Sequence, residues 1–288
     1  MIWIFSFLGK NSGINGLMQR VFHKESTHTQ SSTIMLIPDG AFSQLFKLRP
    51  ELCSNTHTTY LMRAMVKCIA IVLSGCGVYD GTEIHEASAV LVHLSRAGAK
   101  VQMFAPDVDH MHVVNHCEGK PTAEKRNVLQ ESARIARGDV SDLTKLDITA
   151  FDALVIPGGF GVAKNLSDWA VKGKECTVQP QVEKLIKGFH GVGKPLAMCC
   201  ISPVLAARAL PGCEITVGHD KECERWPYAQ TATTMTELGC KHVNKNVGEV
   251  HVDVKNKLVT TAAFMCNAPI HEVFDGVGVM VTELLKLA

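Results

Sequence analysis

The sequence predicts an α/β protein whose mainly parallel sheet carries helices on both faces. From about residue 67 the chain contains short, continuous apolar runs, which are typical of strands that are buried on both sides. Segments with a helical period lie between these runs, and strands that alternate with helices form parallel sheets. Ligands of such sheets bind at the carboxyl ends of the strands, so we expect the functional residues in the loops after Ser74, Ile156 and Cys199.

The elements follow one another along the chain from an apolar run at 68–74, which predicts the first strand. The next segment, 83–97, predicts a helix because Ala87, Val90, Leu91 and Leu94 share one face of it. Similar patterns predict strands over 100–105, 151–156, 194–199, 214–217, 251–254 and 258–261, and helices over 132–137, 182–190, 202–210 and 277–287.

The first 66 residues differ in composition from the rest of the chain. They are rich in Ser, Thr, His and Asn, and basic residues outnumber acidic ones. That composition is typical of an organelle transit peptide. We therefore predict that residues 1–66 are a leader, either a transit peptide or a disordered segment, and that residues 67–288 form one domain.

The net charge and the cysteine content argue against several classes of protein. The formal net charge is +1, which favours neither a nucleic-acid partner nor a membrane surface. Eleven scattered cysteines without a CxxC pair argue against a disulfide scaffold and against a structural zinc site. We expect free thiols in a reducing compartment, and neither a cofactor nor a metal.

The segment from Lys194 to Leu210 contains the most informative cysteine. An apolar strand passes into a helix there with a single tight turn, and Ser202-Pro203 begins the helix. The residue at the tip of the turn is then Cys200, while Cys199 is the last, buried residue of the strand. A helix that directs its amides at a thiol lowers the pKa of that thiol, so Cys200 is the predicted nucleophile.

Two other segments follow predicted strands and meet the same edge of the sheet. Pro157-Gly158-Gly159 ends one strand, and an amide from this turn together with the amide of Ile201 predicts an oxyanion hole. In the segment 79–86, Glu83 and Glu86 lie on one helix face, so one of them is a candidate proton acceptor beside Cys200.

Histidine is the usual base for a cysteine nucleophile, and the sequence offers several. His219 is the best placed by topology, because it follows the predicted strand 214–217. His85 and His251 are the alternatives.

These segments resemble a known family. Cys200-Ile-Ser-Pro, Pro157-Gly-Gly-Phe-Gly and the helix end Arg96-Ala-Gly98 are similar to the PfpI-like branch of the class I glutamine amidotransferase superfamily. The stretch from Ser74 to Glu86 resembles more narrowly the mitochondrial ES-type, ElbB-like group of that branch, and so does the segment 260–266.

The resemblance implies a flavodoxin-like three-layer sandwich with a nucleophile elbow at Cys200. It implies that the helix glutamate of these enzymes falls on Glu86, their histidine on His219 and their oxyanion-hole amides on Gly159 and Ile201. It also implies a mitochondrial leader, with the cytoplasm as the alternative location, and we expect a homodimer.

Departures from the family's pattern argue against one of its activities, the hydrolysis of glutamine. Ser202 stands where glutamine-hydrolysing relatives have Gly, and no late His-x-Glu motif completes their triad, so we do not expect a glutaminase. The first hypothesis is a glyoxalase-type or deglycase-type enzyme that acts on a small carbonyl compound through Cys200. The second is a non-catalytic or redox-responsive protein in which Cys200 is oxidised.

Overall fold

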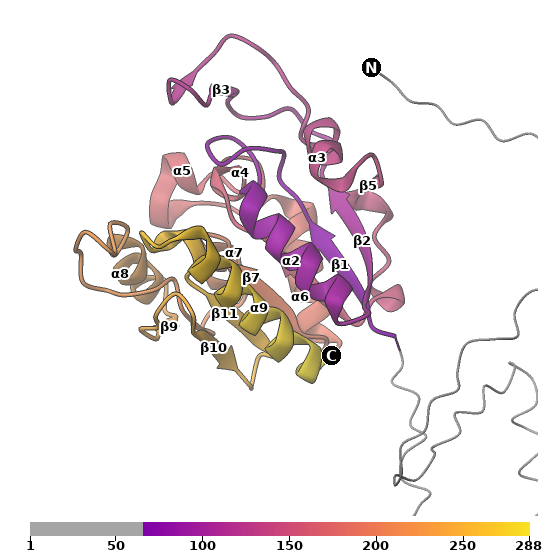
Figure 1. Ribbon diagram of the computed structural model, residues 1–288, viewed down its shortest axis with the longest axis vertical. Coiled ribbons are helices and arrows are strands. Elements are labelled where there is room, and N and C mark those ends of the chain that lie inside the picture. The colour runs from indigo at the N-terminus through magenta and orange to yellow at the C-terminus, as the bar shows by residue number, and fades with distance from the viewer. Residues whose placement is uncertain (1–65) are drawn as a thin grey trace, which may run out of the picture. The chain divides into compact units, whose positions relative to one another are not determined.

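The structure is a computed structural model that describes residues 66–288. The predicted leader, 1–66, therefore lies outside the described residues except for Val66. Seven strands form the main sheet, and all neighbouring pairs are parallel except the pair at one edge, which is antiparallel (Figure 1). In spatial order they are β10 (Val250–Asp253), β11 (Leu258–Thr261), β7 (Leu196–Cys199), β6 (Ala153–Ile156), β1 (Cys68–Val72), β2 (Lys100–Ala105) and β5 (Val140–Asp142).

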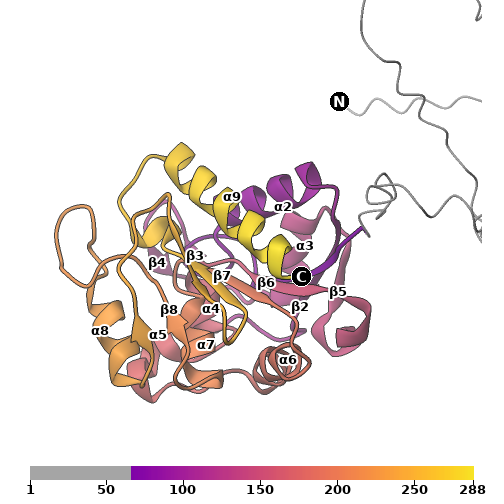
Figure 2. The same cartoon turned by 90° about the horizontal axis from the view of Figure 1, so that it is seen from below.

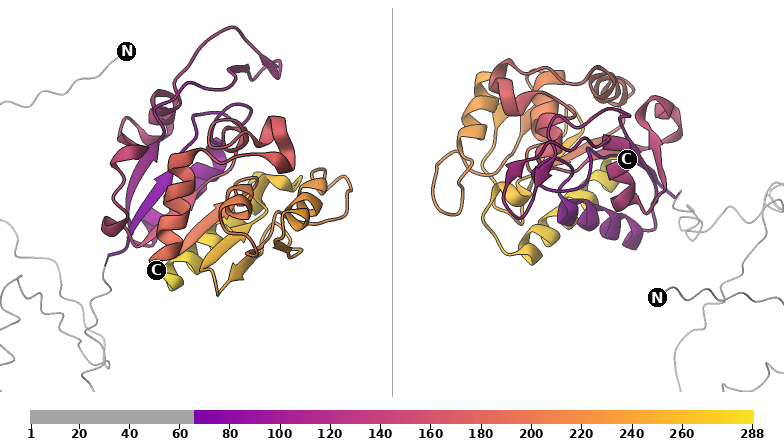
Figure 3. Two further views of the ribbon diagram at one scale, coloured as in Figure 1. Left: turned by 180° about the vertical axis from the view of Figure 1, so that it is seen from behind. Right: turned by 90° about the horizontal axis from the view of Figure 1, so that it is seen from above.

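Helices cover both faces of this sheet, which confirms the predicted three-layer α/β sandwich (Figure 2). One face carries α2 (Ile84–Arg96), α3 (Val128–Ala136) and α9 (Ile270–Leu287). The opposite face carries α6 (Pro180–Gly191) and α7 (Pro203–Ala209), which lie in front of the strands when the molecule is seen from behind (Figure 3).

The core is divided into two apolar layers because successive strand residues point to opposite faces. In β1, Ile69 and Ile71 pack beneath α2 and α9, whereas Ala70 and Val72 pack on the side of α6 and α7. All four are at most 1% exposed. Burial on both faces explains why the sequence shows continuous apolar runs and no alternation of apolar and polar residues.

The predicted strand 214–217 is shorter than expected and lies outside the main sheet. Only β8 (Glu214–Ile215) forms, and it pairs in parallel with β9 (Lys241–His242). This segment is bound to the main sheet by side chains of β10 and β11, and not by backbone hydrogen bonds between strands. The amide of Glu214 donates to Asp253 Oδ2 over 2.7 Å, and the amide of Thr216 donates to Thr260 Oγ1 over 2.9 Å. A strand pattern of only four residues does not specify which sheet the strand joins.

Several short elements complete the described chain. They are the hairpin β3 (Val114–Asn115) and β4 (Lys120–Pro121), the helices α4 (Phe160–Lys164), α5 (Trp169–Lys172) and α8 (Gln230–Glu237), and the single 3₁₀ turns Leu143–Lys145, Ile148–Ala150, Gly173–Glu175 and Ala263–Met265. Within residues 66–288, the helices are all too short or too polar to cross a bilayer.

Candidate active site

Cys200 occupies the tight turn between β7 and α7. Its φ is 59°, in the left-handed region that residues other than glycine rarely adopt. Its amide donates to the carbonyl oxygen of Thr261 on β11 over 3.1 Å, which ties the turn to the neighbouring strand. The chain therefore forms the predicted elbow, with Cys200 at the carboxyl end of the sheet and Cys199 as the last residue of β7, fully buried.

Ser202 stabilises this turn from inside. Its Oγ accepts a hydrogen bond from the amide of Cys199 over 2.9 Å and lies 2.7 Å from the carbonyl oxygens of Ile156 and Cys199. The hydroxyl therefore joins the elbow to the end of β6. Met198, which is bulky for a residue so close to the turn, causes no conflict because its side chain packs in the core on the side of α7.

Glu86 lies on the first turn of α2 and is completely buried. Its carboxyl group accepts the amide of Gly158 at Oε2 over 2.9 Å and the amide of Phe264 at Oε1 over 3.3 Å. The Cys199 thiol donates to Oε2 over 3.7 Å. Cys200 Sγ lies beside the same carboxyl, since a Cβ added at Gly158 would meet both the sulfur and Oε2 within 3.0 Å. Of the two glutamates that the sequence left open, Glu86 is thus the one beside the sulfur.

Glu83 is the N-cap of α2, the helix that carries Glu86. Its Oε2 accepts the amide of Glu86 over 2.7 Å and its Oε1 lies 2.9 Å from His85 Nδ1. Burial is the main reason that the pKa of Glu86 rises to about 7, and the neighbouring Glu83 adds to the rise. A carboxyl group with that pKa can accept and return a proton near neutral pH.

The predicted lowering of the Cys200 pKa is wrong. Burial, followed by the charge of Glu86, raises the pKa of the Cys200 thiol well above its usual range. The amides of Gly159 and Ile201 act in the opposite direction but do not offset the burial. Helix α7 has only seven residues, and its dipole is small compared with the loss of water around the sulfur. Cys200 is therefore a neutral thiol next to a potential base.

The amides of Gly159 and Ile201, which the sequence predicts to form an oxyanion hole, lie beside the Cys200 sulfur. Both amides lower the pKa of the Cys200 thiol, because an N–H group close to the sulfur stabilises its negative charge. Within the described chain, neither amide donates a hydrogen bond to an oxygen of another residue. Gly159 has a φ of 101°, which explains why glycine stands at this position. Two amides that are directed at one place can stabilise a negative oxygen there.

The structure does not bring His219 together with these groups. Its ring stacks on Trp226 with centroids 4.6 Å apart, and it does not line the pocket that contains Cys200. Of the alternatives, His251 lies away from the site, with its Nε2 3.1 Å from Glu214 Oε2. His85 lies at the edge of the site, because it contacts Glu83 and its ring centroid is 6.1 Å from that of Phe264, and both of these residues line the pocket.

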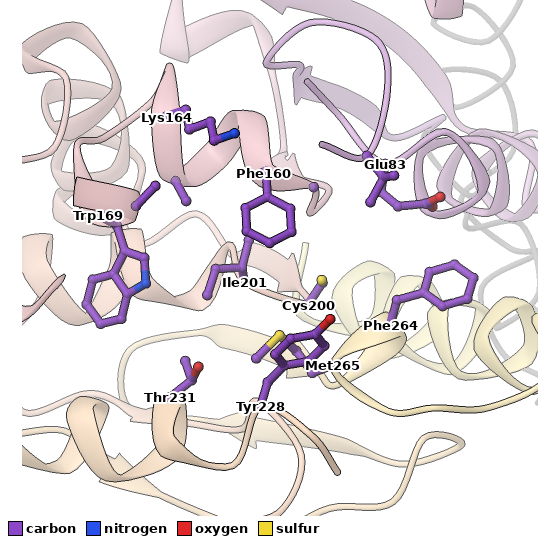
Figure 4. Close-up of a pocket in the computed structure, with 14 residues that line it drawn as sticks. Glu83, Phe160, Lys164, Trp169, Cys200, Ile201, Tyr228, Thr231, Phe264 and Met265 are labelled. Carbon is purple, nitrogen blue, oxygen red and sulfur yellow. The ribbon is translucent and has the colours of Figure 1, made fainter. Parts of the chain in front are cut away.

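Cys200 opens into a pocket of about 450 Å³ (Figure 4). Most of the lining is apolar or aromatic, and it includes Phe160, Trp169, Ile201, Tyr228, Phe264 and Met265. In the part of the chain that the structure describes, there is no group of three His, Cys, Asp or Glu side chains suited to hold a metal ion.

Comparison with known proteins identifies the family. The chain is 60% identical over 221 residues to a human protein, the mitochondrial glutamine amidotransferase-like class 1 domain-containing protein 3, and the match covers 76% of this chain and 82% of that one. It is 55% identical over 244 residues to the mitochondrial ES1 protein homolog of Rattus norvegicus, covering 81% and 92%. The chain belongs to this mitochondrial ES1 family of glutamine amidotransferase-like proteins.

A solved structure from another organism has the same fold as this chain. The isoprenoid biosynthesis protein with an amidotransferase-like domain from Ehrlichia chaffeensis shares the fold at a TM-score of 0.70 and 32% identity, over 77% of this chain and 99% of that one. A scan against protein-family models gave no match. The ES1 relatives above are named as mitochondrial, which confirms the predicted location for this ES1 family member.

Sequence reasoning missed two parts of this ES1 site. The amide of Phe264 reaches Glu86 because Ala263 adopts a φ of 45°, and an alanine does not signal such a turn. The aromatic rings of Phe160 and Trp169 come from the short helices α4 and α5, and that of Tyr228 from the turn before α8, none of which has a clear period. The Pro-Gly-Gly turn was the signal for Gly159, but it did not reveal that Gly158 is the partner of Glu86.

Proposed function

We propose that this chain is a cofactor-independent glyoxalase-type enzyme in which Cys200 attacks a small carbonyl compound and Glu86 accepts the proton. The observation that carries the proposal is the position of the Cys200 sulfur beside the buried Glu86 carboxyl, since a Cβ added at Gly158 would meet both within 3.0 Å. The pKa of this carboxyl is about 7. Because the thiol is neutral, the base must be adjacent to it, and Glu86 meets that requirement.

The first step of the proposed reaction is addition. With glyoxal as substrate, the sulfur of Cys200 forms a bond to one carbonyl carbon while the thiol proton passes to the Glu86 carboxylate. The carbonyl oxygen becomes an oxyanion, which the amides of Gly159 and Ile201 stabilise. Return of the proton from Glu86 to that oxygen gives a hemithioacetal.

The second step is an internal transfer of hydrogen. Glu86 removes the proton on the carbon bonded to sulfur, and the hydroxyl proton on that carbon moves to the neighbouring oxygen, which passes through an enediol. Glu86 then returns its proton to the neighbouring carbon. The hemithioacetal becomes a thioester of glycolic acid without any external oxidant, since one carbon is oxidised and its neighbour is reduced. Water then attacks the thioester, and glycolate and the free thiol of Cys200 are released. A deglycase-type reaction would differ only in its start, where the thiol displaces an amine from the carbonyl adduct.

Turnover of glyoxal to glycolate, followed by proton NMR, tests the proposal. The wild-type protein should produce glycolate, C200A should produce none, and E86Q should produce at most a small residual amount. C117A is the matched control, because Cys117 is an exposed free thiol on the hairpin. Equal turnover in wild type and C200A would refute the proposal.

The redox-responsive protein is the second candidate. It is favoured by the same two amides, Gly159 and Ile201, which would stabilise the charged oxygens of a sulfinic acid on Cys200. The raised pKa of the thiol counts against it, because peroxide reacts with thiolates. Treatment with hydrogen peroxide and intact-mass measurement distinguishes the two: addition of two oxygen atoms to Cys200 before the exposed thiols of Cys117 and Cys223 react would favour the redox candidate.

A further inference from the structure

The pocket is much larger than the substrate class named so far requires. Its volume of about 450 Å³ lies within the range that ligand pockets of roughly 300–1,000 Å³ span for drug-sized molecules. Glyoxal has four non-hydrogen atoms and would leave most of this space to water. A larger carbonyl compound would fill more of this space.

Aromatic rings surround the space next to the sulfur. Figure 4 shows Phe160 and Tyr228 on the two sides of Ile201 and Cys200, with the indole of Trp169 on the far wall. The Phe160 and Tyr228 side chains remain 43% and 49% exposed, although such residues prefer burial. A flat apolar group that enters between the rings would remove their exposed faces from water and stack on them.

The charged groups of the lining are already engaged within the protein. Lys164 Nζ donates to the carbonyl oxygen of Tyr79 over 2.7 Å and lies 5.5 Å from the centroid of the Phe160 ring. The Glu83 carboxylate holds the amide of Glu86 and the ring of His85. The side chains of Phe160, Trp169 and Tyr228 that line the walls beyond the sulfur are suited to an uncharged apolar group.

We propose that the preferred substrates are 2-oxoaldehydes with an uncharged aryl group on the ketone carbon, which binds between Phe160, Tyr228 and Trp169. This inference rests on the proposed function and names its substrate class. The aldehyde carbon lies at Cys200, and the same addition, hydrogen transfer and hydrolysis convert an aryl glyoxal and water into an aryl hydroxy acid.

Binding without chemistry tests the inference by itself. The probes are two uncharged hydroxyketones, 2-hydroxyacetophenone and hydroxyacetone, which differ only in phenyl against methyl. Calorimetry on C200S, which cannot form the thiol adduct, should give a Kd for 2-hydroxyacetophenone at least about tenfold lower than that for hydroxyacetone. Equal Kd values, or no binding of the aryl compound, would overturn the inference.

Variants locate the preference at the rings. W169A should reduce the ratio of kcat/KM for phenylglyoxal to that for glyoxal by about tenfold, and W169F should retain most of it because it keeps a ring. V171A is the matched control, since Val171 lies on the same helix, is 68% exposed and does not line the pocket. Thermal unfolding checks that each variant is folded, and an unchanged ratio in folded W169A contradicts the inference.

The outcomes separate the two proposals. Selective binding of the aryl ketone without turnover of either aldehyde retains the aryl pocket and refutes the enzyme. Turnover of glyoxal without selective aryl binding retains the enzyme and refutes the aryl preference.

Discussion

The amide of Gly158 donates a hydrogen bond to Glu86 Oε2 over 2.9 Å, and this contact joins the end of β6 to the first turn of α2. A side chain at position 158 would collide with both Cys200 and the Glu86 carboxyl. Glycine at this position is therefore what allows the carboxyl and the sulfur to meet. The first turn of α2, the turn after β6 and the elbow at Cys200 are far apart in the sequence but meet at one edge of the sheet.

Replacement of Gly158 by Ala should damage the site directly. We expect G158A to lower the free energy of unfolding by about 1–3 kcal/mol because the added methyl group overpacks the site. Displacement of the sulfur should reduce kcat/KM for glyoxal by roughly a hundredfold. G191A is the control: no atom lies near its added Cβ, and its stability should be unchanged or higher by up to about 1 kcal/mol. Urea unfolding and glycolate production measure both effects, and wild-type behaviour of G158A would contradict the geometry.

Ionisation of Glu86 should make stability depend on pH. The carboxyl has a higher pKa in the folded protein, about 7, than its ordinary value of 4.5, so the folded state binds more protons between these two values. Its contribution is fully present below pH 4.5 and is lost as the pH rises through 7. We expect a loss of about 3 kcal/mol, which E86Q should not show. Urea unfolding at pH 5 and pH 8 measures the difference, and identical pH dependence in both proteins would argue against a buried, ionisable Glu86.

Removal of the Ser202 hydroxyl should loosen the elbow. In S202A the amide of Cys199 loses its partner inside the core, and we expect the unfolding free energy to fall by about 1–3 kcal/mol. S88A changes the same chemical group on the exposed face of α2 and should stay within about 0.5 kcal/mol of wild type. Denaturant midpoints check this, and equal midpoints for the two variants would mean that the hydroxyl is not needed.

The role of His219 stays a prediction that one variant can test. If His219 transferred a proton during catalysis, H219N would lower kcat/KM by about a hundredfold or more. Because its ring stacks on Trp226 and does not line the pocket, we expect kcat/KM for glyoxal to change by less than about threefold. A hundredfold loss in a folded H219N protein would return His219 to the catalytic group.

The elbow and its sulfur could be predicted from sequence because they depend on local patterns. An apolar strand followed at once by Ser202-Pro203 defines the turn, and Cys200 is the residue left at its tip. Glu86 was separated from Glu83 only through the resemblance, since both glutamates share one helix face. Both are buried in the structure, which separates them by their partners: Glu86 accepts the amides of Gly158 and Phe264, whereas Glu83 caps α2.

The remaining features depend on contacts between distant segments. The Phe264 amide reaches Glu86 across 178 residues, and no local pattern records that contact. The direction of the Cys200 pKa was predicted wrongly because the helix end is visible in the sequence while the loss of water is not. In the same way, β8 has the residues of a sheet strand, but side chains of β10 and β11 hold it beside the main sheet.

The pH dependence of kcat/KM for glyoxal in wild type and E86Q tests the pairing of Cys200 and Glu86 most directly. If Glu86 is the base, kcat/KM of the wild type rises with pH through about 7, because only the carboxylate can take the thiol proton. E86Q should lack this rise and retain at most a small residual rate. A wild-type profile that is flat between pH 6 and pH 8, or the same rise in E86Q, would contradict the assignment.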